Sequence, residues 1–188
     1  GLAGGITLLC LTPGGTMERF VSLVYAFSVC WLFTASAVYH AQKREENSMN
    51  IWRKFDHFAI FFMIAGTYTP LCYYLLTGPM RSGIIIAQWS LVILGVVFKL
   101  FFMHAPRWLY TSIYILMGWM ALIPIKQLFR AMDPLAFTFL FAGGVVYTVG
   151  AVIYARKRPN PFPGIFGFHE IFHLLIVARL IGLGAVLS

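Results

Sequence analysis

Long uninterrupted apolar runs constrain the fold of this chain more than any other feature. A membrane-spanning helix needs about 20 mainly apolar residues, and several runs reach that length. These runs cover residues 20–41, 55–77, 83–103, 108–128, 135–155 and 165–187. Glycine and proline residues typical of turns separate them, and no stretch alternates as the strands of a membrane barrel do. The sequence therefore predicts an all-α membrane protein.

The opening stretch, residues 1–11, is apolar but about half as long as a span. We interpret it as the end of a truncated first helix. Counting this fragment, the predicted fold is a seven-transmembrane-helix bundle. Residues 1–188 then form one transmembrane domain, because neither a long linker nor an internal repeat divides the chain.

Composition agrees with a membrane protein. Of the 188 residues, 60% are hydrophobic and 11% are charged, whereas soluble domains carry about 25% charged residues. The net charge of +8 resides in short connectors, which fits anionic lipid headgroups and topology signals rather than nucleic acid. We therefore expect membrane lipids as partners and no nucleic acid. Cys10, Cys30 and Cys72 all lie in apolar runs and are expected to be small apolar fillers rather than disulfides.

The basic residues predict the orientation in the membrane. The larger group falls at connectors that would share one side: Lys43, Arg44, Arg53, Lys54, Lys99, Arg107, Arg156, Lys157 and Arg158. The smaller group falls on the other side: Arg19, Arg81, Lys126 and Arg130. Because Lys and Arg accumulate in cytoplasmic loops, the larger group marks the cytoplasm. This places the N-terminus in the cytoplasm and the C-terminus outside.

Four ionisable residues fall at one predicted depth. His40 closes the second helix, Asp56 opens the third, and His169 and His173 lie in the first turns of the seventh. The predicted orientation brings all four to the cytoplasmic ends of their helices. Ionisable side chains within spans are costly and are functional candidates by default. The four residues therefore predict a common site in the inner leaflet.

The residue types at these positions suit zinc. His169 and His173 are four residues apart and share a helix face, as do Ser36 and His40. Three imidazoles from two helices would leave a fourth zinc position for water, as in catalytic zinc sites. Asp56 could accept a hydrogen bond from that water or orient a ligand. Ser36 could steady the water or a substrate oxygen, so the expected cofactor is Zn²⁺.

Other interpretations of these residues remain open at this point. The stretch HEIFH also fits the H-E-x-x-H pattern of zinc peptidases, in which Glu170 would be the base. Asp56 could instead cap its helix or pair with Arg53 or His57. A histidine at the end of a span is often only an interfacial side chain. His57 and His104 are expected to be structural.

Four stretches resemble a known family. They are SAVYH at 36–40, FDHFAI at 55–60, IAGTYTP at 64–70 and FHEIFH at 168–173. In this order and on these helices they resemble the hemolysin III family, the bacterial branch of the progestin and adipoQ receptor family. The resemblance extends from the second helix onward. It implies seven helices with a cytoplasmic N-terminus and a zinc ion near the cytoplasmic leaflet.

The resemblance also implies roles for individual residues. The zinc ligands of the family correspond to His40, His169 and His173. The family aspartate, which holds the zinc-bound water, corresponds to Asp56, and the motif serine corresponds to Ser36. Adiponectin receptors are similar to alkaline ceramidases and are linked to hydrolysis of the ceramide amide.

The leading hypothesis is a zinc-dependent intramembrane hydrolase of a lipid amide or ester, whose substrate enters between helices from the bilayer. A receptor or membrane-stress sensor with a structural zinc site is the main alternative. A hemolysin-type pore is less favoured, because pores need a polar path through the whole membrane. The expected location is the bacterial inner membrane, as a multi-pass integral protein.

Overall fold

The computed structural model describes residues 15–42, 51–101 and 107–156, and every regular element in these ranges is a helix. In chain order these are α2 (Thr16–Gln42), α3 (Ile51–Leu75), α4 (Gly78–Phe101), α5 (Arg107–Trp119), the short 3₁₀ helix η1 (Met120–Leu122), α6 (Ile125–Ala131) and α7 (Pro134–Arg156). The predicted all-α class is confirmed over the described ranges.

Four described helices are long and apolar enough to cross a membrane: Thr16–Tyr39, Lys54–Leu75, Gly78–Phe101 and Pro134–Ile153. All four begin before the apolar runs that predicted them, and the difference is four or five residues for three of them, α2 at Thr16, α3 at Ile51 and α4 at Gly78. Helical backbone hydrogen bonding continues through their polar first turns, where hydropathy alone gives no signal. The predicted first and seventh helices lie outside the described residues, so the seven-helix count and the orientation stay predictions.

The run at 108–128, predicted as one span, contains a break. Trp108–Leu122 and Ile125–Ala131 meet at an angle of 58°. Pro124 lies at the break, directly before α6. Proline has no N–H to donate, and its ring clashes with the carbonyl group four residues earlier in a continuous helix. The apolar composition is continuous here, but the helix is not.

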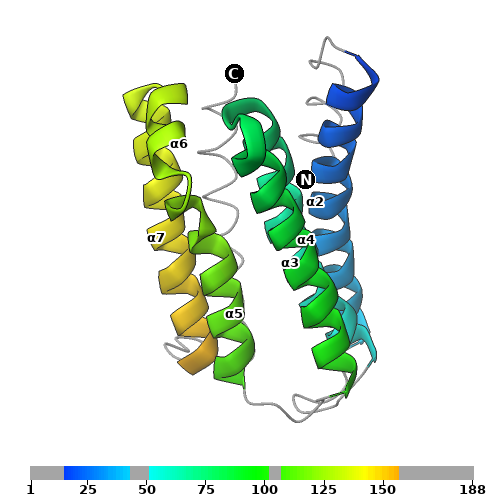
Figure 1. The fold of residues 1–188 in the computed structure, drawn as a ribbon. Helices are drawn as coiled ribbons and strands as arrows, with labels where there is room; N and C mark the ends of the chain where they lie inside the picture. The colour runs from blue at the N-terminus through cyan, green and yellow to red at the C-terminus, as the bar shows by residue number, and fades with distance from the viewer. Residues whose placement is uncertain (1–14, 43–50, 102–106, 157–188) are drawn as a thin grey trace. The chain divides into compact units, whose positions relative to one another are not determined.

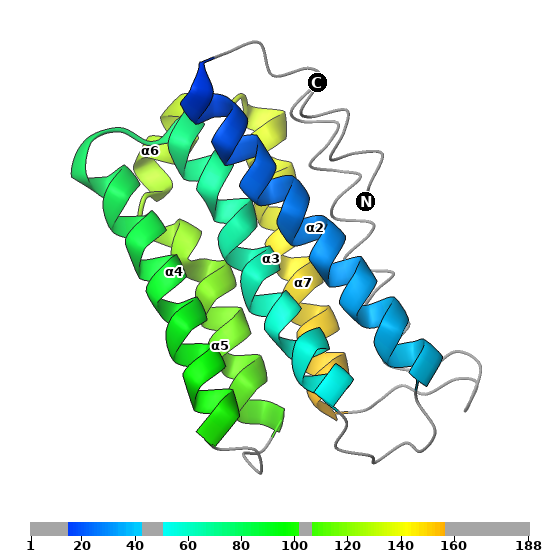
Figure 2. The same ribbon diagram turned by 90° about the vertical axis from the view of Figure 1, so that its right-hand side faces the viewer.

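Contacts between Cα atoms divide the chain into two compact units, residues 1–104 and 105–188. In the first unit α3 packs against both α2 and α4. The ribbon colours run down α2 and back up α3, so these two helices are antiparallel (Figures 1 and 2). In the second unit α7 packs against α5 and α6.

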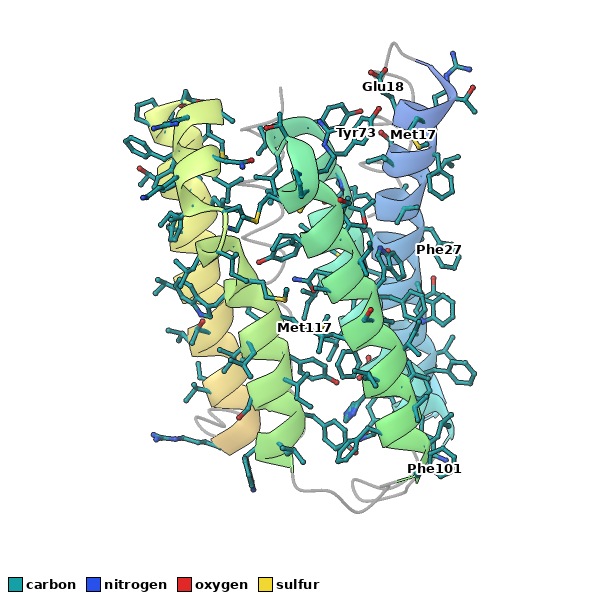
Figure 3. The ribbon with its side chains drawn as sticks, in the orientation of Figure 1. Met17, Glu18, Phe27, Tyr73, Phe101 and Met117 are labelled. Atoms are coloured by element: carbon teal, nitrogen blue, oxygen red, sulfur yellow. The ribbon has the colours of Figure 1, made fainter. Side chains whose placement is uncertain are left out.

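The corner between α3 and α4 is held by polar contacts. Gly78 has a φ of 63°, a left-handed conformation that glycine adopts without strain. Arg81 donates from Nε to the Leu76 carbonyl at 2.7 Å, and its guanidinium lies 5.3 Å from the centre of the Tyr73 ring. Tyr73 lies toward the same end of this unit as Met17, and Phe101 lies at the opposite end (Figure 3). This unit therefore has one end where α2 and α4 begin and another where α3 begins.

The start of α7 is a capped helix terminus. Asp133 precedes Pro134, the first residue of α7, and accepts hydrogen bonds from the backbone N–H groups of Leu135 at 2.8 Å and Ala136 at 3.0 Å. Aspartate before the helix and proline at its first position are both favoured, because the first N–H groups of a helix lack helical partners. These two residues therefore mark the boundary between α6 and α7.

The described residues of the first unit contain two cysteines. Cys72 is buried and Cys30 is partly buried, and both are free thiols. This agrees with the expected role of small apolar fillers. Cys10 lies outside the described residues.

Candidate functional site

Ser36 lies on the buried face of α2. Its side chain is 7% exposed, and it follows buried Ser22 and Val29 at intervals of seven residues, which keep one helix face. Exposed residues such as Phe27, at 55%, lie on other faces of α2. The serine is therefore part of the packed side of the helix rather than its lipid-facing side.

Asp56 lies inside α3 rather than at its start. The helix begins at Ile51, five residues earlier, so Asp56 is too far along the helix to act as its cap. Its side chain is only 3% exposed. The capping interpretation left open by the sequence is therefore wrong, and a carboxylate is buried in the second turn of a membrane-spanning helix.

Close contacts fix the register between α2 and α3. A Cβ atom added at Gly66 would lie 2.6 Å from the Cβ of Ser28, so the helices touch at this point. Nearby, the rings of Trp31 and Phe62 stack with centroids 5.2 Å apart and planes 4° apart. The two contacts indicate the same register. Trp31 lies three residues after Ser28 on α2, and Phe62 lies four residues before Gly66 on antiparallel α3.

This register brings Ser36 and Asp56 to one level. Ser36 lies eight residues beyond Ser28 on α2, and Asp56 lies ten residues before Gly66 on α3. At about 1.5 Å per residue, they are about 12 and about 15 Å from the helix contact, in the same direction. Both therefore lie near the end of the first unit where α2 finishes and α3 begins.

The two residues also lie on one side of the helix pair. The stacked rings of Trp31 and Phe62 mark the side that faces α4, because Phe62 also meets the Trp89 ring edge-on at 5.7 Å. At about 100° per residue, Ser36 is about 140° round α2 from Trp31, and Asp56 is about 120° round α3 from Phe62. Since the helices are antiparallel, both rotations lead to the same side, away from the stacked rings.

His57 is also buried, at 5% exposed, but on another part of α3. It is one residue from Asp56 and therefore about 100° further round the helix. The side chain of His57 therefore leaves α3 in a different direction from that of Asp56.

The structure describes only part of the predicted zinc site. The backbone of His40 belongs to the last turn of α2, but its side chain lies outside what the structure describes. His169, Glu170 and His173 lie outside the described residues altogether. Within the described ranges, no group of three or more His, Cys, Asp and Glu side chains is placed to hold a metal ion. The three-histidine site thus stays a prediction.

Sequence reasoning missed the contacts that set this geometry. Neither Ser28 nor Gly66 was singled out, because a serine and a glycine within apolar runs are common. Their alignment depends on the tertiary register of two helices. The signal was present only as the small residue Gly66 within the IAGTYTP motif.

Comparison with known proteins identifies the family of the chain. The family described as "Haemolysin-III related" matches residues 2–182. The chain is a member of the haemolysin III family. The resemblance found from the four sequence motifs is therefore confirmed. Taken with its several apolar helices, this makes the chain a multi-pass integral protein of a bacterial membrane.

Individual relatives agree with this assignment. The "Hemolysin-3 homolog" of Bacillus subtilis is 33% identical over 154 residues, which cover 82% of this chain and 69% of the relative. "Hemolysin-3" of Bacillus cereus is 32% identical over 173 residues, covering 92% and 76%. The "Adiponectin receptor protein" of Drosophila melanogaster is 28% identical over 180 residues, covering 87% and 40%. No solved structure gives a significant match.

Proposed function

We propose that this haemolysin III family member is a zinc-dependent intramembrane hydrolase that acts on a lipid amide or ester. One observation carries the proposal: the buried Asp56 carboxylate and the buried Ser36 hydroxyl lie at one level and on one side of the α2–α3 pair. A proton-accepting group and a hydrogen-bonding group thereby lie on the same side of the helix pair, within the membrane-spanning segments.

The neighbouring donor set fits zinc. His40 follows Ser36 by one turn on α2, and together with His169 and His173 it would supply three neutral imidazoles, a set that suits zinc. A divalent cation bound near Asp56 would be attracted by the charge of this buried carboxylate. When bound, zinc supplies a Lewis acid and lowers the pKa of water to about 7.

The residues of the chain then have distinct roles. Asp56 would accept a proton from the attacking water as general base, a role that contributes about 100-fold to 10,000-fold in rate. Ser36 would donate a hydrogen bond to an oxygen of the substrate and fix its position. The packing around both side chains excludes bulk water, which strengthens such interactions.

The test is hydrolysis of a ceramide and of a matched lipid ester by the purified protein in lipid vesicles, with a pair of aspartate variants. We expect Asp56→Asn to lower the rate at least about 100-fold, because the amide cannot take up the proton. Asp133→Asn is the matched control, and it should keep the rate because asparagine also caps helices.

Two results would contradict this function. Wild-type protein loaded with zinc that cleaves neither lipid would favour the sensor with a structural zinc site. Undiminished hydrolysis by Asp56→Asn would remove the role assigned to this carboxylate.

A further inference from the structure

The second half of α3 contains a proline, Pro70, within a continuous helix. Among the four described helices long enough to cross a membrane, α3 is alone in having a proline beyond its first turn. Proline has no N–H group, so Pro70 cannot donate the helical hydrogen bond to the carbonyl group of Gly66, four residues earlier. The backbone ladder of α3 is therefore interrupted at this point, within a membrane-spanning segment.

Glycine and threonine weaken the same segment of α3. Gly66 is a poor helix former, because glycine loses more conformational freedom on folding than any other residue. Thr67 and Thr69 each donate from Oγ1 to the backbone carbonyl group four residues earlier, at 2.8 and 2.9 Å. Such hydrogen bonds from a threonine side chain often bend helices. Residues 63–70, which we call the pivot, should therefore bend more easily than a regular helix.

Hydrogen bonds tie the far end of the pivot to its surroundings. The Thr69 hydroxyl accepts from the indole N–H of Trp89 on α4 at 3.2 Å. Just beyond the end of α3, the Leu76 carbonyl accepts from Arg81 of α4 at 2.7 Å. With this end held to α4, a bend at the pivot displaces the other half of α3, which begins at Ile51.

The half of α3 that would move contains Asp56. This residue lies ten residues before Gly66, about 15 Å along the helix axis. A sharp kink at a proline exceeds about 20°, and a change of half that size would move Asp56 by about 3 Å. Misplacement by about 1 Å can cost a reaction about 100-fold in rate. A small bend at the pivot is therefore enough to decide whether the carboxylate is in place for proton transfer.

We propose that Pro70 is a positioning residue that acts through Asp56. In this proposal α3 bends at the pivot, and the bend moves the carboxylate between a position from which it takes the proton of the attacking water and a position further away. The effect on rate rests on the proposed hydrolase function, whereas the bend itself does not. Hinge motions of this kind take microseconds to milliseconds, a range that NMR relaxation dispersion detects.

Two substitutions of Pro70 separate bending from loss of the proline ring. Pro70→Ala and Pro70→Gly both remove the ring and restore the N–H group, but only alanine also favours a stiff helix. Pro79→Ala is the control, because Pro79 lies in the first turn of α4, where a proline removes no helical bond. We expect Pro70→Ala to lower the rate of lipid hydrolysis about tenfold, and Pro70→Gly and Pro79→Ala to stay within about twofold of wild type.

The bend is measured separately by fluorine NMR of the full chain in lipid nanodiscs. The probe is trifluoromethylphenylalanine in place of Phe55, which directly precedes Asp56 and is 39% exposed. We expect relaxation dispersion from exchange in the wild type, Pro70→Gly and Pro79→Ala, and its loss in Pro70→Ala. Zinc content, measured on the same samples, should be equal in all four proteins, because none of these substitutions touches a predicted ligand.

Several outcomes would overturn the proposal. Absence of exchange in the wild type, or equal exchange in Pro70→Ala, would remove the bend. Equal loss of hydrolysis in Pro70→Ala and Pro70→Gly would assign the effect to packing of the proline ring, and an unchanged rate in Pro70→Ala would remove the positioning role. If exchange depends on Pro70 while wild-type protein cleaves neither lipid, the bend stands and the hydrolase function fails, so the two failures are distinguishable.

Discussion

The two helices α3 and α7 are held to their neighbours by the same arrangement of side chains. In the first unit Trp89 donates from its indole N–H to the Thr69 hydroxyl at 3.2 Å. In the second unit Trp119 donates in the same way to Thr148 at 2.9 Å. Each threonine in turn donates to the carbonyl group four residues earlier in its helix, at 2.9 and 2.8 Å. The same Trp–Thr hydrogen bond between helices therefore occurs once in each unit.

The helices differ in how they use aspartate. Asp133 is exposed and caps α7, a role that any helix start can need. Asp56 is buried within α3 and lies too far from the helix start to cap it. The helix α7 packs against its neighbours although it has no charged residue in its interior. A buried carboxylate such as that of α3 is therefore not needed for the packing of such a span. This contrast is the structural reason for treating Asp56 as functional.

The helices also differ at their glycines, and this difference gives the largest expected effect on stability. A Cβ atom at Gly66 would clash with Ser28, whereas one at Gly144 would lie 3.8 Å from the Trp119 ring, an ordinary contact. We expect Gly66→Ala to lower the free energy of unfolding by about 1–3 kcal/mol through overpacking. Unfolding in mixed detergent micelles would measure it.

Gly144→Ala is the matched control. It should keep or raise stability by up to about 1 kcal/mol, because alanine is the better helix former. If Gly66→Ala were as stable as Gly144→Ala, the close approach of α2 and α3 would be wrong. The register that aligns Ser36 with Asp56 would then lose its basis.

The aspartates give the next effect. We expect Asp133→Ala to lower the free energy of unfolding by about 1 kcal/mol, because α7 loses the acceptor for two backbone N–H groups. Asp133→Asn should restore most of it. Asp56→Ala, compared in zinc-free protein, removes no cap, so asparagine at position 56 should not give the recovery that a restored cap gives at position 133. If Asp56→Ala lowered the free energy of unfolding and Asp56→Asn restored it, Asp56 would act as a cap like Asp133, and the two aspartates would not differ in role.

The shared Trp–Thr arrangement gives the smallest effect. We expect Trp89→Phe and Trp119→Phe each to lower the free energy of unfolding by about 0.6 kcal/mol, the average for a hydrogen bond between membrane helices. Phenylalanine keeps most of the ring and removes the donor. Double variants with Thr69→Val and Thr148→Val would isolate each bond. If the coupling energy between tryptophan and threonine were near zero in one unit but not in the other, the two arrangements would not be equivalent.

Hydropathy predicted most of the helices because length and apolar composition are local properties of the chain. It failed at Pro124, where an apolar run continues but a proline ends the helix. It also placed the start of α3 at residue 55 rather than Ile51, because the first turn contains Arg53 and Lys54. The broken span and the earlier helix start both depend on backbone hydrogen bonding, which hydropathy does not report.

The candidate site was predictable to a different degree. The sequence predicted that Asp56 shares a depth with His40 and that Ser36 lies one turn before His40 on the same helix face. The α2–α3 register places Ser36 near the level of Asp56. It did not predict that both lie on the side away from the stacked Trp31 and Phe62 rings. That result requires the register and rotation of two helices, which arise from the contact of Ser28 with Gly66. The positions of the three histidine side chains stay predictions.

The most direct measurement is the zinc content of the purified protein, compared across wild type, His40→Ala, His173→Ala, Asp56→Ala and Glu170→Ala. We predict one zinc per chain in wild type, lost in both histidine variants and largely kept in Glu170→Ala. Asp56→Ala separates a carboxylate that acts on water from one that holds the metal, and we expect it to keep most of the zinc. Wild-type protein without zinc, or zinc content indifferent to His40→Ala, would contradict the three-histidine site.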